Sequence, residues 1–221
     1  MPFITGSDAK EVQTILNKLP RNVKLLYFTQ ELECQYCRET RQLMEELKEL
    51  GNGKIALEIY NFVNDKGQVS KYKIDKIPAI AISVDDTDYG IRYYGIPSGY
   101  EFSSLMEDIQ EISKGEPSLS EETRKQVQKI TQPLHLQVFV TPTCPYCPNA
   151  VLLAHKLAML NENITADMVE ATEFPHLAMR YNVRGVPRTI IGEDHAIEGA
   201  LPEANFVQKV MEAYNEMYPS N

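Results

Sequence analysis

The chain places all four of its cysteines in two short quartets of the form C-x-Y-C. Cys34 and Cys37 belong to "CQYC", and Cys144 and Cys147 belong to "CPYC". Two cysteines three positions apart can face one another across the first turn of a helix, so that one attacks a substrate sulfur and the other then releases the substrate. The types and spacing of these residues therefore predict thiol–disulfide exchange.

Each quartet lies between a strand-like segment and a helical pattern. Residues 23–29 and 134–141 are apolar and strand-like, and helical patterns follow the quartets up to Gly51 and over 149–160. A helix N-terminus stabilises negative charge and can lower a cysteine pKa from about 8.5 to ~3.5–7.5. The first cysteine of each pair is therefore expected to be a reactive thiolate.

The two quartets mark an internal repeat. Cys34 and Cys144 are offset by 110 positions, and "YKIDKIPAI" aligns with "YNVRGVPRT" at an offset of 109. A repeat of this length indicates a duplicated domain rather than a solenoid, whose repeats have roughly 20–50 residues. We expect two units, residues 1–116 and 117–221.

The boundary between the units is marked by helix-ending and helix-starting signals. Gly115 and Pro117 are expected to end one helix, and Ser118 with Glu121 has the S-x-x-E spacing of a capping box that would begin the next. In both units the expected order is helix, strand, cysteine pair, helix, strand, short helix, X-Pro step, two short strands and closing helix. This β-α-β then β-β-α order predicts an α/β fold with a mixed sheet.

Composition excludes several classes of partner. The formal net charge of −9 is spread along the chain, so that no basic patch for nucleic acid or an anionic membrane surface is present. No apolar run approaches the ~18 residues that a membrane span needs. We expect a cytoplasmic protein without nucleic-acid or membrane partners.

Two alternatives to redox chemistry are open at this point. Four cysteines could bind one structural zinc, but such pairs usually lie ~15–20 residues apart, whereas 107 positions separate Cys37 from Cys144. The pairs could also be inert disulfides, although a bridge over one helical turn constrains the unfolded chain little. No metal site is predicted. His155 is interpreted as a partly buried helix residue rather than a proton shuttle.

The motifs resemble those of the thioredoxin-fold superfamily. Residues 144–147, "CPYC", are similar to the glutaredoxin active-site quartet, and "RGVP" (184–187) is similar to the thioredoxin segment that carries a cis-proline. The tandem arrangement resembles the protein disulfide oxidoreductases of thermophilic archaea and bacteria, which are glutaredoxin-like and related to protein disulfide isomerase. This resemblance implies two tandem thioredoxin-like domains, each a four-stranded mixed sheet flanked by helices.

The resemblance also implies roles for individual residues. Cys34 and Cys144 would attack substrate, Cys37 and Cys147 would resolve the mixed disulfide, and each pair would form a redox-active disulfide. Pro78 and Pro187 would be cis, with Ile77 and Val186 turned toward an extended substrate. Tyr36 and Tyr146 are further candidates for substrate contact. Thioredoxins have a buried acid six residues before the first cysteine, where this chain has Phe28 and Val138, so that no proton acceptor is assigned.

The function that follows is a dithiol–disulfide oxidoreductase that oxidises, reduces or isomerises disulfides of protein substrates. It would bind no cofactor and would draw electrons from NADPH indirectly, through a flavoprotein that resembles thioredoxin reductase. The alternatives are a dedicated electron donor to a peroxidase, with a peroxiredoxin as partner, and a non-catalytic zinc-binding or peptide-binding module.

The two pairs are not expected to be equivalent. Cys34 follows Glu33, whereas Cys144 has no acidic neighbour in the sequence until Glu162. A nearby carboxylate disfavours a thiolate and raises the cysteine pKa. Because a stable thiolate stabilises the reduced pair, Cys144 and Cys147 are predicted to form the stronger oxidant.

Overall fold

The computed structural model describes residues 2–219, in which the helices and strands follow the predicted order. The first half contains α1 (Gly6–Asn17), β1 (Val23–Thr29), α2 (Cys37–Leu50), β2 (Ile55–Asn61), α3 (Lys66–Lys71), β3 (Ala79–Val84), β4 (Thr87–Tyr94) and α4 (Glu101–Lys114). The second half contains α5 (Glu121–Val127), β5 (Leu134–Val140), α6 (Cys147–Leu160), β6 (Ile164–Glu170), α7 (Pro175–Arg180), β7 (Arg188–Ile191), β8 (His195–Glu198) and α8 (Glu203–Met217). The predicted α/β class with a mixed sheet is confirmed.

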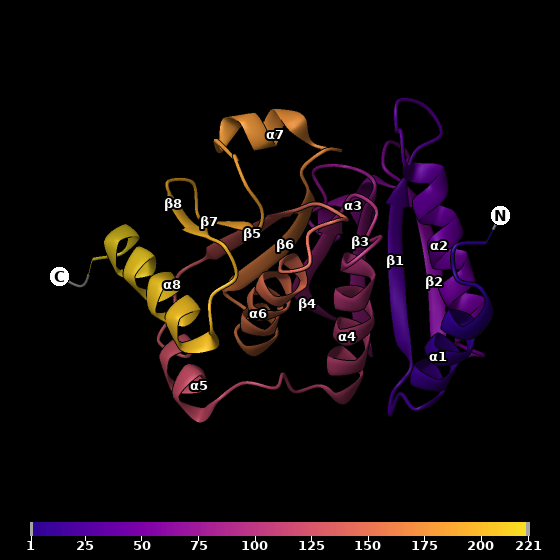
Figure 1. The fold of residues 1–221 in the computed structure, drawn as a ribbon, viewed down its shortest axis with the longest axis horizontal. Coiled ribbons are helices and arrows are strands. Elements are labelled where there is room, and N and C mark those ends of the chain that lie inside the picture. Colours follow the sequence, from indigo (N-terminus) through magenta and orange to yellow (C-terminus); the bar gives the residue numbers. More distant parts are fainter. Residues whose placement is uncertain (1, 220–221) are drawn as a thin grey trace.

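One continuous sheet runs through both halves of the molecule (Figure 1). Its eight strands have the order β2-β1-β3-β4-β6-β5-β7-β8, so that each half contributes four adjacent strands. The two halves meet where β4 pairs with β6 in parallel, with residues 91–94 beside 166–169. The two four-stranded sheets expected from the sequence are therefore joined edge to edge.

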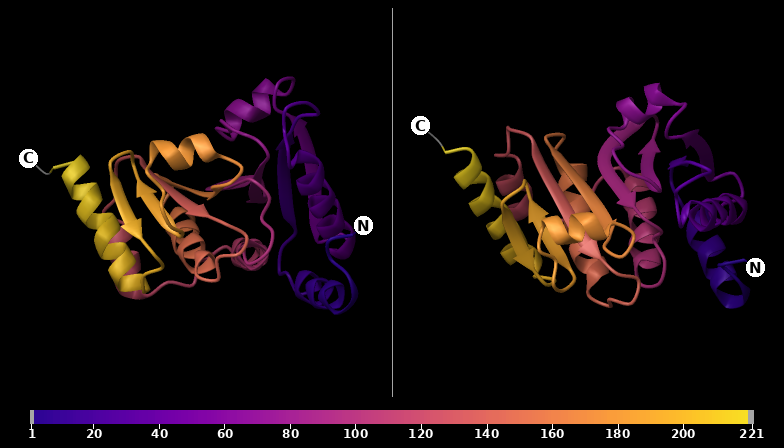
Figure 2. Two further views of the ribbon diagram at one scale, coloured as in Figure 1. Left: turned by 45° about the horizontal axis from the view of Figure 1, so that its top comes forward. Right: turned by 90° about the horizontal axis from the view of Figure 1, so that it is seen from above.

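Helices cover both faces of this sheet. The core on one face is formed with α1, α2, α4, α5, α6 and α8, and the smaller core on the other face is formed with α3 and α7. In the left view of Figure 2, α3 and α7 both lie above the sheet. Alternation along β3 supplies both cores, because Ile80 and Ile82 face one side while Ala79 and Ala81 face the other.

The segment between the halves follows one of the predicted signals and departs from the other. The helix α4 ends at Gly115, whose φ of +90° suits a residue without a Cβ. The predicted capping box was wrong by two residues, because the N-cap of α5 is Ser120, whose Oγ accepts a hydrogen bond from the Thr123 amide. Ser118 instead donates its N–H to the Glu111 carboxylate over 2.7 Å. In residues 2–219, every helix is too short or too polar to span a bilayer.

Candidate active site

Both cysteine pairs form disulfides at the same kind of junction. The Cys34–Cys37 disulfide follows the carboxyl end of β1, and the Cys144–Cys147 disulfide follows the carboxyl end of β5. The second cysteine of each pair is the first residue of a helix, α2 or α6, and the Cα atoms of each pair are 5.5 Å apart. Each disulfide therefore lies at a helix N-terminus, where unpaired N–H groups favour a thiolate after reduction.

The two sulfurs of each pair differ in exposure. Cys34 is partly exposed whereas Cys37 is 4% exposed, and Cys144 is 7% exposed whereas Cys147 is fully buried. A substrate sulfur can approach the first cysteine of each pair more readily than the second. This order is consistent with the attacking and resolving roles that the resemblance implies.

A cis-proline lies beside each disulfide. The Ile77–Pro78 and Val186–Pro187 peptide bonds are cis, as the resemblance implies. Topology brings them to the cysteines, because β3 and β7 run antiparallel to β1 and β5 and begin where those strands end. Sγ of Cys144 lies 3.7 Å from the Val186 carbonyl oxygen.

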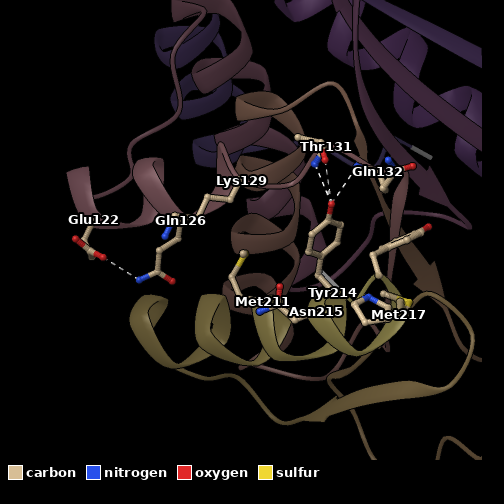
Figure 3. A pocket seen from close by; sticks show the side chains of 11 residues that line it. Glu122, Gln126, Lys129, Thr131, Gln132, Met211, Tyr214, Asn215 and Met217 are labelled. Carbon is tan, nitrogen blue, oxygen red and sulfur yellow. Dashed lines mark hydrogen bonds between the residues drawn. The ribbon is translucent and has the colours of Figure 1, made fainter. Parts of the chain in front are cut away.

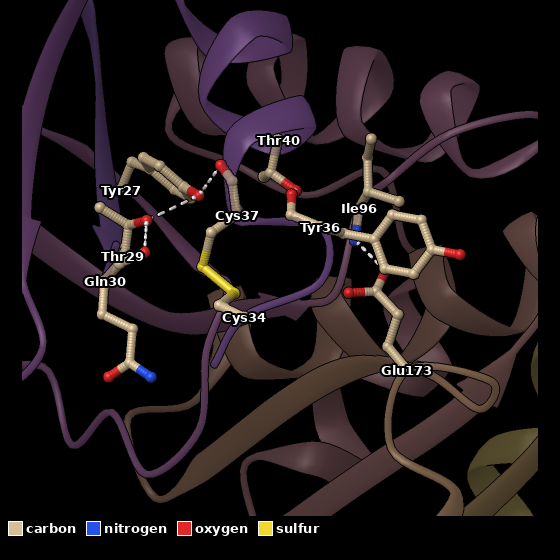
Figure 4. Close-up of a disulfide and its surroundings, with 9 residues drawn as sticks. All are labelled: Tyr27, Thr29, Gln30, Cys34, Tyr36, Cys37, Thr40, Ile96 and Glu173. Atoms are coloured by element: carbon tan, nitrogen blue, oxygen red, sulfur yellow. Dashed lines mark hydrogen bonds between the residues drawn. A yellow bond between two sulfur atoms is a disulfide. The ribbon is translucent and has the colours of Figure 1, made fainter. Parts of the chain in front are cut away.

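The tyrosines of the two quartets have different surroundings. Tyr146 is 67% exposed, whereas Tyr36 is half-buried and packs against the core. In Figure 4 the Tyr36 ring lies beside Ile96 and Glu173. Tyr146 is thus open to a partner, and Tyr36 covers part of the surroundings of its disulfide.

The resolving cysteine of the N-terminal pair is anchored by a buried tyrosine. The Tyr27 hydroxyl donates a 2.6 Å hydrogen bond to the Cys37 carbonyl oxygen, as Figure 4 shows. Burial raises the pKa of Tyr27, so that this hydroxyl stays protonated and remains a donor. The first turn of α2 is therefore fixed to β1 behind the disulfide.

A carboxylate from the second half of the chain reaches the N-terminal site. Glu173 lies in the loop after β6, and its Oε1 accepts a 2.6 Å hydrogen bond from the Ile96 amide. Burial raises the pKa of Glu173 to about 7, and the charges of Glu170 and Glu39 act in the same direction. Sequence reasoning missed Glu173 because no local pattern links it to Cys34.

A second acid that sequence reasoning missed is Glu101, in the first turn of α4. It is 1% exposed, it accepts a hydrogen bond from the Ser104 hydroxyl, and burial raises its pKa to about 7. The preceding Tyr100 amide donates to the Pro142 carbonyl, which places the start of α4 next to the CPYC loop. Glu101 thus lies near the C-terminal disulfide.

The contact between α4 and α6 indicates which end of α6 lies near Glu101. Asp108, two turns after Glu101, is hydrogen-bonded to Nδ1 of His155, and both side chains are fully buried. Two turns before His155 on α6 is the first turn, which contains Cys147. Glu101, at the start of α4, therefore lies toward the end of α6 that carries the resolving cysteine. The expectation of a partly buried His155 was wrong, because α4 covers it completely and Asp108 is its partner.

One sizeable pocket lies away from this chemistry. It has a volume of about 910 Å³ between α5 and α8, and Tyr214 in it accepts hydrogen bonds from the Thr131 and Gln132 amides (Figure 3). These amides precede β5, whereas Cys144 follows β5. The pocket is therefore at the opposite end of that strand from the disulfide. Among the described residues, no cluster of three or more potential metal ligands is present.

Comparison with known proteins supports the same chemistry. Residues 134–212 match the model of the thioredoxin domain family. The structure is similar to that of a protein disulfide oxidoreductase from Aeropyrum pernix, with a TM-score of 0.89 and 28% identity over 98% of this chain and 96% of that one. It is also similar to the N-terminal domain of alkyl hydroperoxide reductase AhpF from Enterococcus faecalis, with a TM-score of 0.83 and 25% identity over 94% and 98% of the two chains.

Curated relatives are longer proteins. The chain is 25% identical over 148 residues to an NADH dehydrogenase of Bacillus subtilis and 26% identical over 165 residues to an alkyl hydroperoxide reductase of Staphylococcus epidermidis. These matches cover 67% and 75% of this chain but only 29% and 31% of the relatives. With two disulfides at equivalent junctions of tandem thioredoxin-like folds, the findings support oxidoreductase activity by thiol–disulfide exchange.

Proposed function

We propose that the protein is a dithiol–disulfide oxidoreductase that acts on protein substrates through both disulfides. The observation that carries this proposal is the repetition of one arrangement, in which a disulfide at a helix N-terminus lies beside a cis-proline. The similarity to a protein disulfide oxidoreductase over nearly the whole chain supports it. We further propose that residues 1–116 and 117–221 are the two units.

Oxidation of a client at the C-terminal site begins with attack of a client thiolate on Cys144. A bond forms between the two sulfurs, the Cys144–Cys147 bond breaks, and Cys147 leaves with the electron pair as a thiolate. A second client thiolate then attacks the client sulfur of the mixed disulfide, and Cys144 leaves. The client gains a disulfide and the protein gains two thiols. The reverse sequence reduces a client disulfide.

Glu101 is the proposed proton acceptor for Cys147 when the reaction runs in the reducing direction. Cys147 must lose its proton before it can attack the mixed disulfide, and it is fully buried. A buried carboxyl toward the same end of α6, with a pKa raised to about 7, suits proton transfer near neutral pH. Glu101 on α4 would thus provide the proton-accepting acid that is absent at Phe28 of β1 and Val138 of β5.

Electrons for reduction would come from NADPH through a flavoprotein reductase, with no cofactor bound by this chain. The sequence similarity to proteins named NADH dehydrogenase and alkyl hydroperoxide reductase supports a link to such a reductase. The same similarity favours a second candidate, a dedicated electron donor to a peroxidase such as a peroxiredoxin. A cytoplasmic location remains part of the proposal.

A direct assay separates the two candidates. The reduced protein should reduce the disulfides of insulin, and the oxidised protein should form disulfides in a reduced, unfolded client. Activity should fall when either cysteine pair is changed to serine. Fast electron transfer to a peroxiredoxin with no turnover of protein disulfides would instead establish the dedicated donor.

The non-catalytic zinc module is disfavoured by the distance between the pairs. Four strand positions separate β1 from β5, which is about 19 Å at about 4.8 Å per strand. Zn–S bonds measure about 2.3 Å, so that the four sulfurs cannot share one ion. Metal analysis of the fully reduced protein is the test, and one tightly bound zinc per chain would support the module.

A further inference from the structure

The two disulfides lie at the same edge of the sheet. Pairing makes β1 parallel to β2, β4 parallel to β6 and β6 parallel to β5. Because β3 is antiparallel to both β1 and β4, those two strands are parallel as well. The carboxyl ends of all five strands therefore point the same way, and both cysteine pairs follow such an end. We call this the carboxyl edge.

One loop spans the carboxyl edge between the two sites. Residues 95–100 connect β4 to α4, and the Ile96 amide binds Glu173, which lies beside Tyr36 of the N-terminal quartet (Figure 4). At its other end, the Tyr100 amide binds the Pro142 carbonyl, two residues before Cys144. The surroundings of the two disulfides are thus continuous.

Four exposed apolar side chains lie in loops at the same edge. Among residues 2–219, eight large apolar side chains are the most exposed of their kind, and four of them lie in loops that follow carboxyl ends of parallel strands. These four are Leu32, Val63, Tyr100 and Tyr146, with exposures of 78%, 57%, 52% and 67%. Three of the four, Leu32, Tyr100 and Tyr146, lie in loops that carry or join the disulfides, so that they offer apolar contact area to a partner at this edge.

We propose that one unfolded, cysteine-containing polypeptide lies along the carboxyl edge and engages both disulfides at once. This inference rests on the proposed function, because the partner must carry sulfur to react at either end. An unfolded chain exposes both its cysteines and its apolar side chains, and an extended backbone suits the segments at the two cis-prolines. At about 3.3 Å per residue, the ~19 Å between β1 and β5 requires about six residues. Client cysteines separated by fewer residues reach only one site.

The test uses the full chain with Cys37→Ser and Cys147→Ser, which keeps Cys34 and Cys144 as single thiols. The probes are apolar peptides with two cysteines, activated as 2-pyridyl disulfides, and either two or ten residues between them. In each step a protein thiolate forms a bond to a peptide sulfur, the bond to the pyridyl sulfur breaks, and pyridinethione leaves with the electron pair. Absorbance of pyridinethione counts the steps.

The ten-residue spacer should give one peptide per protein, linked to both cysteines. Its second release of pyridinethione should be independent of protein concentration, because both sulfurs are held on one molecule. The two-residue spacer should give a second release proportional to protein concentration and two proteins per peptide. Proportional second release with both spacers would overturn the inference. Failure of the proposed function is a separate outcome, in which single-cysteine peptides react at either site no faster than with a free thiol.

A further pair of variants tests the apolar surface itself. In the same background, Tyr100→Ser should slow the first release at limiting peptide by about fivefold, because apolar contact area is lost. The matched control is Tyr218→Ser, which removes a side chain that is 38% exposed. Its hydroxyl donates to the Pro133 carbonyl before β5, so that it lies away from the carboxyl edge. The control should leave the rate unchanged. Equal rates for the two variants would overturn the role of the apolar edge.

Discussion

The two redox sites share one backbone arrangement but differ in what surrounds it. At the N-terminal site Cys34 is partly exposed, and Glu173 lies beside the quartet. At the C-terminal site both sulfurs are at least nine-tenths buried, a backbone carbonyl lies by Cys144, and a buried acid, Glu101, begins α4. The shared junction provides the chemistry, and the difference in charge and burial provides a means to set each pair's redox equilibrium separately.

Each site also receives an acid from the other half of the chain. Glu101 belongs to the first half and begins α4 beside the loop of the C-terminal pair, whereas Glu173 belongs to the second half and lies beside the N-terminal quartet. Both acids lie near the joint where β4 pairs with β6. The continuous sheet therefore couples the redox properties of each site to the folding of both halves.

The largest difference should appear between the two cysteines of one pair. Cys147→Ser should accumulate mixed disulfides with client proteins, because no internal thiol remains to release them. Cys144→Ser should form none at that site, since the buried Cys147 is out of reach. Non-reducing electrophoresis and mass spectrometry of variants that also lack Cys34 and Cys37 measure this. Equal trapping by both variants would reverse the order of attack.

The second prediction compares the reduction potentials of the two pairs. The C-terminal pair should be the stronger oxidant, near the roughly −200 mV of glutaredoxins, with the N-terminal pair near the roughly −270 mV of thioredoxin. Such a gap corresponds to a factor of about 10² in the equilibrium constant. Equilibration with glutathione of the Cys34→Ser/Cys37→Ser and Cys144→Ser/Cys147→Ser variants gives both values. A more oxidising N-terminal pair would contradict the electrostatic argument.

Glu101→Gln should act only on the C-terminal pair. Release of a trapped client by Cys147 should become about tenfold slower at pH 8, because the amide cannot accept a proton. In the parent protein this rate should rise with pH through about 7, where Glu101 ionises, and the variant should lack this step. Glu107→Gln is the matched control on the same helix, since its carboxylate pairs with Lys156. A control as slow as the variant would exclude Glu101 as the acceptor.

The Glu101 carboxyl should also affect stability. Its contribution to the free energy of unfolding should fall as the pH rises, whereas the rate of client release should rise. The pKa of Glu101 is raised from 4.5 to about 7 on folding, so that its contribution to stability is present below pH 4.5 and is lost as the pH rises through 7. The free energy of unfolding of Glu101→Gln should therefore fall less over this range than that of the parent. Denaturant unfolding at several pH values measures the difference.

Sequence patterns predicted what depends on neighbouring residues. The junction at Cys147 followed from an apolar strand and a helical pattern, and the cis geometry of Pro187 followed from a family resemblance. The joint between β4 and β6 could not be predicted, because each half alone satisfies its own hydrophobic pattern. Glu101 and Glu173 could not be predicted either, since each comes near a cysteine pair only through that joint.

The smallest effect should come from the charges around Cys34. The sequence pointed to Glu33, but that residue is exposed, where water screens its charge. Glu173 is half-buried and is held by the Ile96 amide, so that its carboxylate acts through a less polar medium. It shares this region with Glu39 and Glu170, and Arg41 lies near Tyr27. Replacement of Glu173 should therefore lower the pKa of Cys34 more than replacement of Glu33.

The Cys37→Ser background isolates the Cys34 thiol for this measurement. Glu173→Gln should lower the Cys34 pKa by about half a unit, which is about threefold in the ratio of thiolate to thiol, and Glu33→Gln should change it less. Because the pKa of Glu173 is about 7, the charge is present only above that pH. Alkylation rates of the parent and Glu173→Gln should thus converge below pH 6 and separate above pH 8. A larger shift for Glu33→Gln would show instead that Glu33, the sequence neighbour of Cys34, has the greater effect on the Cys34 pKa.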